Sequence, residues 1–229
     1  TYARSWRFSM SLNLGVLSIQ GDILENILSV QSAINALDID GTVTSVRTPD
    51  EISQVDGLII PGGESTTIGQ LSLANGTLEI LKEKIEQGMP VLGICAGMVM
   101  LSKTAQDKVV GKIDQPLLEI LDIKLERNSF GRQRESFETD ISLTSLGIPT
   151  FNGVFIRAPS ISDVGSDVEI LSKFNEKIIA VKKDNIIVDC TFGGGGYSSE
   201  LLKLSNTKVI ALDRDQSVTG IAKNLKKNF

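Results

Sequence analysis

Four short apolar runs mark the first half of the chain, and each is rich in aliphatic and β-branched residues. They cover residues 12–19, 42–46, 55–60 and 91–94. Short runs that are apolar on both faces are typical of strands buried inside a parallel sheet. The pattern therefore predicts a parallel sheet whose strands are these runs.

Amphipathic stretches separate the apolar runs. Apolar residues recur at roughly helical spacing from Ile23 to Leu37, where Asp22 can cap the helix, and a second helix is predicted from Thr77 to Gln87. A third is predicted from Cys95 to about Lys103. Strands that alternate with helices predict an α/β fold with a three-layer, doubly wound, mostly parallel sheet of the flavodoxin-like kind. Ligands of such sheets bind beyond the carboxyl ends of the strands.

The second half of the chain has a weaker pattern. It is polar and irregular from residue 107 to 137, with strand candidates at 120–125, 153–156 and 178–181. The sequence pattern changes at Asn185. From there it predicts an apolar strand to Phe192, a turn of four glycines, a helix at 198–204 and a strand at 208–212. This strand, glycine turn, helix and strand resemble the opening half of a nucleotide-binding domain.

Composition narrows the class of protein. The chain has 229 residues, of which 41% are hydrophobic and 22% charged, as in ordinary globular proteins. A formal net charge of −5 argues against nonspecific binding to nucleic acid. Two cysteines do not make a disulfide framework, so we expect a cytoplasmic protein. Residues 1–11 are basic and aromatic without the apolar core of a signal peptide, and we interpret them as a disordered leader.

The most informative chemical motif is Gly-Ile-Cys-Ala-Gly at residues 93–97, between a predicted strand and a predicted helix. A sharp turn from strand to helix needs small neighbours and exposes the nucleophile at its tip. The N-terminus of the following helix stabilises a thiolate and directs N–H groups at an oxyanion. A buried apolar cysteine is the alternative. The two flanking glycines favour Cys95 as a nucleophile.

A second glycine-rich turn, Pro61 to Thr67, follows the apolar run at 55–60. It suits a turn in which Ser65 or Thr66 caps a helix. It also suits a ligand loop, in which Gly63 offers an N–H group to an oxyanion and Glu64 and Ser65 offer polar groups. The residues alone leave both interpretations open.

Five motifs follow one another along the chain: IQGD at 19–22, PGGESTT at 61–67, GICAGM at 93–98, ERNSFGRQ at 126–133 and FNGVFIRAP at 151–159. Together they resemble the glutaminase subunit of pyridoxal 5′-phosphate synthase, a class I glutamine amidotransferase, over about residues 12–187. The resemblance implies an amidotransferase domain at 12–186 that hydrolyses L-glutamine to L-glutamate and ammonia. It also implies a (β/α)₈ synthase subunit as partner, in a large hetero-oligomer, to which ammonia is channelled for vitamin B6 synthesis. No cofactor, metal, nucleic acid or membrane is implied.

The resemblance also implies roles for individual residues. Cys95 attacks the side-chain amide of glutamine, and the backbone N–H groups of Gly63 and Ala96 form the oxyanion hole. The residues implied to bind glutamine are Gly63, Glu64, Ser65, Arg127, Ile156 and Arg157. Without the resemblance, Arg127 and Arg157 would be interpreted as solvated cations or members of surface ion pairs.

One part of the family pattern is missing. The family carries Ser-Phe-His-Pro-Glu on a late strand, where the histidine is the base and the glutamate orients it. This chain has Thr-Phe-Gly-Gly-Gly at 191–195, so Gly193 and Gly195 stand at the histidine and glutamate positions, and it contains no histidine at all. Because general acid–base assistance is worth about 10²–10⁴-fold, we expect strongly impaired turnover. A non-catalytic docking protein with a glutaminase-like surface is the alternative.

Residues 187–229 resemble the start of the 16S ribosomal RNA cytosine N4-methyltransferase family, through IVDCTFGGGGYSSELL and VIALDRD. The positions implied to form a vestigial S-adenosylmethionine site are Gly195, Gly196, Tyr197 and Asp213. Two strands alone cannot bury a core. We therefore expect a junction near residues 183–187, made by fusion or misassembly of genes, between a nearly complete glutaminase and a truncated methyltransferase start. The apolar residues 186–190 are suited to supply the final strand of the glutaminase, and a methyltransferase fragment is the third functional hypothesis.

Overall fold

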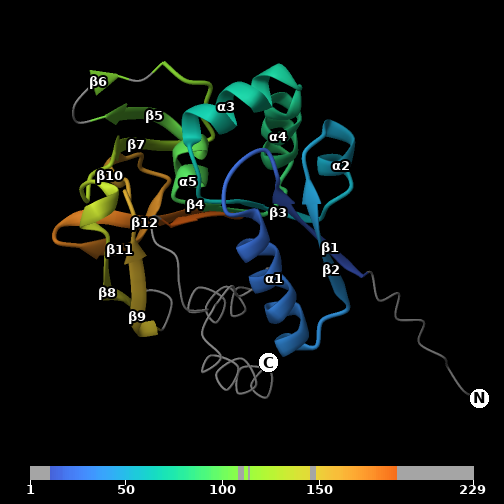
Figure 1. Cartoon of the computed structure of the whole chain (residues 1–229), viewed down its shortest axis with the longest axis horizontal. Helices are drawn as coiled ribbons and strands as arrows, with labels where there is room; N and C mark the ends of the chain where they lie inside the picture. Colours follow the sequence, from blue (N-terminus) through green and yellow to red (C-terminus); the bar gives the residue numbers. More distant parts are fainter. Residues whose placement is uncertain (1–10, 108–110, 113, 145–147, 190–229) are drawn as a thin grey trace, which may run out of the picture.

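The computed structural model describes residues 11–107, 111–112, 114–144 and 148–189 (Figure 1). Its strands are β1 (Leu12–Leu17), β2 (Gly41–Val46), β3 (Gly57–Ile60), β4 (Val91–Ile94), β5 (Ser102–Asp107), β6 (Gly111–Lys112), β7 (Leu121–Arg127), β8 (Phe137–Leu143), β9 (Ile148–Phe155), β10 (Ser160–Val164), β11 (Glu169–Phe174), β12 (Lys177–Lys183) and β13 (Ile186–Asp189). Its helices are α1 (Ile23–Leu37), α2 (Pro49–Ser53), α3 (Ser65–Ala74), α4 (Thr77–Glu86), α5 (Ala96–Leu101) and the 3₁₀ turn η1 (Gln133–Glu135).

One large sheet organises the described part of the chain. Its order is β2-β1-β3-β4-β13-β12-β10-β7-β5-β6, with β11 added beside β12, and β8 and β9 form a separate hairpin. The four pairs from β2 to β13 in this order, β2 with β1, β1 with β3, β3 with β4 and β4 with β13, are all parallel. The predicted mostly parallel α/β sheet is therefore confirmed, while antiparallel pairs such as β12 with β13 and β10 with β7 make its other half mixed.

Helices lie on both faces of the parallel half, as a doubly wound fold requires. Figure 1 shows α1 on one side of β3 and β4, and α3 and α4 on the other. Val30 and Ile34 of α1 are buried against Val16 of β1 and Ile59 of β3 in one apolar cluster. This explains the helical spacing of apolar residues in α1, since the strands below it are apolar on that face.

The elements that the sequence pattern missed lie mainly in the mixed half and around the second glycine-rich turn. Strands β5, β8, β10 and β11 and helix α2 were not predicted, and α3 was one of two interpretations that the sequence left open. The helix after Cys95 is also shorter than expected, because Ser102 already has extended backbone and begins β5. The hydroxyl of Ser102 donates to the carbonyl of Val99 at 2.7 Å and so helps to end the helix.

Strand β13 belongs to the sheet although it lies at the predicted junction. Its residues pair in parallel with Val91–Ile94 and antiparallel with β12. The predicted leader (all but Ser11), Cys190 and the predicted elements at 198–204 and 208–212 lie outside the described residues, as do Gly193, Gly195, Gly196, Tyr197 and Asp213. Within the described ranges, no helix is long and apolar enough to cross a membrane.

Candidate active site

Cys95 lies at the tip of a sharp turn between β4 and α5. Its backbone has φ 47° and ψ −97°, a conformation that residues with a side chain rarely adopt. Strained backbone of this kind is common at functional sites, where the surrounding structure holds it. The side chain is half-buried. Cys95 therefore combines a strained backbone with a partly exposed thiol.

The glycines on either side of Cys95 are required by close packing. A Cβ on Gly97 would lie 2.1 Å from the carbonyl oxygen of Ile60, and one on Gly93 would lie 2.6 Å from a methyl group of Leu101. Ala96 is the first residue of α5, so no carbonyl within the helix accepts its N–H. The turn thus presents a thiol and a backbone donor side by side.

The second glycine-rich turn lies beside the nucleophile. A Cβ on Gly62 would be 3.9 Å from the Cβ of Cys95. The turn is fixed from behind by residues 20–22: the N–H of Asp22 donates to the carbonyl of Gly62 at 3.0 Å, and a Cβ on Gly63 would lie 2.9 Å from the Cα of Gly21. Gly63 therefore follows directly on the residue that packs against Cys95, and residues 20–22 fix the turn that contains both glycines.

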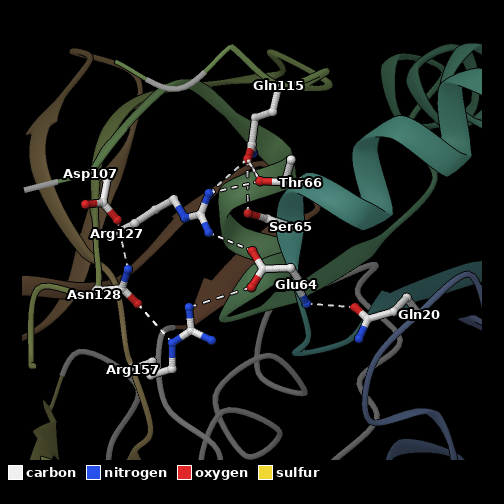
Figure 2. A network of polar contacts seen from close by, with 9 residues as sticks. All are labelled: Gln20, Glu64, Ser65, Thr66, Asp107, Gln115, Arg127, Asn128 and Arg157. Atoms are coloured by element: carbon white, nitrogen blue, oxygen red, sulfur yellow. Dashed lines mark hydrogen bonds and ion pairs between the residues drawn. The ribbon is translucent and has the colours of Figure 1, made fainter. Parts of the chain in front are cut away.

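Glu64 joins two arginines from distant parts of the chain (Figure 2). One carboxylate oxygen accepts from Arg127 Nη2 at 2.7 Å, and the other lies 3.6 Å from Arg157 Nη2. Its own N–H donates to Gln20 Oε1 at 2.7 Å. The Arg127 side chain is only 14% exposed, so it is not a solvated surface cation. Three of the predicted binding residues thus form one charged cluster.

A carboxamide, Gln115, completes this cluster. Its Oε1 accepts from Thr66 Oγ1 at 2.9 Å, from Ser65 Oγ at 3.3 Å and from Arg127 Nη1 at 3.3 Å. Arg127 Nη1 also donates to Thr66 Oγ1 at 3.1 Å. Gln115 is 8% exposed, and its Nε2 is buried without a hydrogen-bond partner among the residues that the structure describes. The oxygen of Gln115 thereby ties the start of α3 to the end of β7.

Arg157 is held from the opposite side. Its Nε donates to Asn128 Oδ1 at 3.2 Å, and Asn128 Nδ2 donates to Asp107 Oδ2 at 2.9 Å. Both Asn128 and Arg157 have positive φ, at 52° and 49°. Ile156, beside Arg157, is 51% exposed and is free of the apolar core. The arginine and its exposed neighbour therefore border the same polar network.

Comparison with known proteins agrees with this geometry. Residues 16–196 match the SNO glutamine amidotransferase family. The chain belongs to this family. A protein of Nitrosopumilus maritimus named pyridoxal 5′-phosphate synthase subunit PdxT is 62% identical over 178 residues, which are 78% of this chain and 87% of that protein. The protein of the same name from Staphylothermus marinus is 44% identical over 76% of this chain and 86% of its own length.

Solved structures and a second family model extend the comparison. A crystal structure of a glutamine amidotransferase matches with a TM-score of 0.68 and 32% identity, over 93% of this chain and 98% of that one. Residues 167–229 also match the MraW methylase family, and they overlap the amidotransferase match. The described part of that overlap contains β11, β12 and β13, which are all strands of the amidotransferase sheet.

Two details of the amidotransferase site differ from expectation. Neither Ser65 nor Thr66 caps α3, because the helix already begins at Ser65 and Glu64 occupies the capping position. The Ser65 side chain is 3% exposed and its hydroxyl is directed at Gln115. Asp22 occupies the capping position of α1, but its side chain makes no capping hydrogen bond.

The carboxyl group of Asp22 lies instead beside the second glycine-rich turn. Its Oδ2 is 3.3 Å from the position that a Cβ on Gly62 would take. Partial burial, with a smaller contribution from the negative charge of Glu25, raises the pKa of Asp22 above its ordinary value. An acidic group therefore borders the turn that lies next to Cys95.

Several residues of this site were not singled out from the sequence. Gln20 lies within IQGD and Asn128 within ERNSFGRQ, so the motifs contained them without indicating what they contact. For Thr66 the sequence suggests only the role of a helix cap. Gln115 lies in an irregular segment and carries no signal in the sequence, because its contacts come from residues about 50 positions earlier.

Proposed function

We propose that this chain is a glutaminase subunit of pyridoxal 5′-phosphate synthase, which hydrolyses L-glutamine to L-glutamate and ammonia. The observation that carries the proposal is the strained turn at Cys95, next to the turn that contains Gly63. The names of the relatives at 62% and 44% identity support it. We keep the division into an amidotransferase domain at 12–186 and a segment of separate ancestry at 187–229 as a proposal, although β13 crosses this boundary and the amidotransferase match runs on to residue 196.

The reaction starts with the thiolate of Cys95. Its sulfur attacks the side-chain carbonyl carbon of glutamine, and the N–H groups of Gly63 and Ala96 stabilise the negative oxygen. The C–N bond then breaks, the nitrogen gains a proton and leaves as ammonia, and a γ-glutamyl thioester remains. Water cleaves the thioester, which releases glutamate and returns the thiol.

Substrate recognition uses the charged cluster. Arg127 and Arg157 bind the α-carboxylate of glutamine, because two guanidinium groups that converge on one point match a carboxylate. Glu64 contacts the α-ammonium group. Ser65 fixes the start of α3 through Gln115, and the exposed Ile156 contributes apolar surface at the edge of the site.

No imidazole is present to act as the general base and acid in these proton transfers, because the sequence contains no histidine. Cys95 then depends on the helix terminus and on solvent to lose its proton. We expect glutamate release to be slower by about 10²–10⁴-fold than in a glutaminase with a histidine base. Ammonia leaves toward a (β/α)₈ synthase subunit, and the word subunit in the names of the relatives supports the existence of a partner.

The test measures glutamate release from glutamine by the purified full chain, with and without a synthase subunit. Slow release that is abolished in Cys95→Ser supports the proposal, and release at the rate of a histidine-containing glutaminase contradicts the impairment. A glutamine-analogue electrophile provides a second readout. Labelling of wild type but not of Cys95→Ser at mildly alkaline pH supports the nucleophile, and no labelling of either protein contradicts it.

A non-catalytic docking protein is the second candidate, and the absence of histidine favours it. It predicts binding to a synthase subunit with no glutamate release above background. A methyltransferase activity rests only on the match at 167–229. Calorimetry with S-adenosylmethionine tests it, and we expect no detectable heat of binding.

A further inference from the structure

The carboxylate of Glu64 occupies the point at which two arginines converge. Its two oxygens face different guanidinium groups, Arg127 at 2.7 Å and Arg157 at 3.6 Å (Figure 2). Each arginine has a further anchor that does not involve Glu64. Arg127 is held by Thr66 and Gln115, and Arg157 by Asn128. Each arginine therefore has a contact that does not depend on the Glu64 carboxylate.

Apart from the contacts of its carboxylate with the two arginines, the hydrogen bonds described for Glu64 are made by its backbone. Its N–H donates to Gln20 Oε1 at 2.7 Å, and its carbonyl accepts from the N–H of Ile68 at 3.0 Å in the first turn of α3. The side chain is 38% exposed, whereas that of Arg127 is 14% exposed. A rotation of the Glu64 side chain thus breaks neither of these backbone hydrogen bonds, which hold the start of α3 and the second glycine-rich turn.

We propose that the Glu64 carboxylate competes with the ligand carboxylate for Arg127 and Arg157. Only a ligand that carries both a carboxylate and an ammonium group displaces Glu64 and still leaves it with an ion-pair partner. This inference rests on the proposed function and deepens it. The ligand carboxylate replaces Glu64 on Arg127 and Arg157, and the released Glu64 carboxylate pairs with the ligand ammonium. The exchange makes the site specific for α-amino acid amides.

The charges of the site explain this selectivity. Two guanidinium groups and one carboxylate are joined, so the cluster carries one excess positive charge. A ligand with only a carboxylate must break the contact between Glu64 and Arg127 and leaves Glu64 without a cation. A zwitterion breaks the same contact and forms a new one. The selectivity therefore has two sources. Glu64 is left without a cation in the complex with a simple carboxylate, and it pairs with the ammonium group in the complex with an amino acid.

The test compares L-glutamine with glutaramate, which has the same amide and carboxylate but lacks the α-amino group. Binding is measured by calorimetry on the full chain for wild type, Glu64→Gln and Glu64→Asp. Glu64→Gln keeps the size of the side chain and removes the competing charge, and Glu64→Asp keeps the charge. Asp163→Asn is the matched control, since it removes a carboxylate from an exposed ion pair with Lys124 outside the cluster.

We expect wild type to prefer glutamine, and Glu64→Gln to bind glutaramate at least about fivefold more tightly than wild type does. Glutamine should bind Glu64→Gln more weakly than wild type. Glu64→Asp and Asp163→Asn should show no gain for glutaramate. Thermal melting of each variant establishes that it is folded.

An unchanged or weaker affinity of Glu64→Gln for glutaramate overturns the inference. If wild type still binds glutamine in that case, the proposed function stands and only the competitor role fails. If neither wild type nor Glu64→Gln binds either compound, the proposed function fails and the inference fails with it.

Discussion

Gly97 and Ile60 are so close that a side chain on Gly97 would overlap the main chain of Ile60: its Cβ would lie 2.1 Å from the carbonyl oxygen. The helix after Cys95 can rest on β3 only with glycine at this position. We predict that Gly97→Ala destabilises the fold by about 3 kcal/mol and shifts Cys95. Chemical denaturation measures the first effect, and labelling by a glutamine-analogue electrophile measures the second.

Gly111→Ala is the control for this substitution. Among the described residues, no atom lies within 4 Å of a Cβ built on Gly111, although its φ of 78° disfavours a side chain. It should cost about 1 kcal/mol and leave labelling of Cys95 unchanged. Equal effects of the two substitutions would show that the contact with Ile60 is not what requires glycine.

Replacing Gln115 should weaken the site without unfolding it. Gln115→Ala removes the oxygen that accepts from Arg127, Thr66 and Ser65. Arg127 keeps Thr66, so we expect the half-saturating concentration of the glutamine-analogue electrophile to rise about fivefold. The limiting rate of labelling should stay the same, because Cys95 is untouched. Gln87→Ala, which removes only an exposed hydrogen bond to Glu83, should change neither value.

Phe155 is the centre of an aromatic cluster. It is 1% exposed, and its ring centroid lies 4.8 Å from those of Phe130 and Phe137 and 5.2 Å from that of Phe174. We predict that Phe155→Ala costs about 4 kcal/mol of unfolding free energy, whereas Phe155→Leu costs about 1.5 kcal/mol. Urea denaturation provides both values. If Phe155→Ala cost less unfolding free energy than Phe155→Leu, Phe155 would not be the centre of the aromatic cluster.

Asp22 should make stability depend on pH in one direction. Its pKa in the folded state is raised above 3.8 by burial and by Glu25, so the folded state favours the protonated form. This stabilising contribution is full below the unfolded pKa and is lost as the pH rises through the folded pKa. Asp22→Asn should therefore raise the melting temperature by roughly 1 °C at pH 7, and the difference should vanish near pH 3.

Asp163 provides a comparison of opposite sign. The hydrogen bond and the charge of Lys124 lower its pKa, so its contribution to stability is present above the unfolded pKa and is lost as the pH falls. Asp163→Asn should lower the melting temperature at pH 7, if only slightly because both groups are exposed. If Asp22→Asn and Asp163→Asn shifted the melting temperature at pH 7 in the same direction, the opposite pKa shifts of the two carboxyl groups would be contradicted.

The missing base can be tested by restoring it. We predict that the double substitution Gly193→His and Gly195→Glu raises glutamate release by about 10²-fold or more over wild type. Gly193→His alone should give a smaller increase, because the imidazole then lacks its orienting carboxylate. No increase in either variant would mean that these positions do not reach Cys95.

The parallel half of the fold could be predicted from the sequence because its strands are buried on both faces. Val91 to Ile94 is such a run, and β4 has these bounds. Strands such as β10 (SISDV) and β11 (EILSKF) carry exposed polar residues and lack that signal. Helix α3 stayed an open interpretation because it begins at Ser65, inside the second glycine-rich turn, with Glu64 and no capping serine or threonine before it.

The candidate site was predictable where a turn imposes a local requirement, as around Cys95. Its polar network was less so, because the partners lie far apart in the chain. Arg127 and Glu64 are 63 positions apart, and Gln115 and Thr66 are 49 apart. No local pattern encodes such pairs. Only the fold, which brings β7 next to the start of α3, determines that these side chains meet.

Strand β13 has a consequence for how the protein is made on the ribosome. It is the last described strand in the chain, yet it lies between β4 and β12, away from both edges of the sheet. Until residues 186–189 have emerged, β4 and β12 both present unpaired backbone groups. The nascent chain therefore cannot finish its sheet early, and a ribosome that pauses before residue 186 leaves two open strand edges for aggregation or chaperone binding.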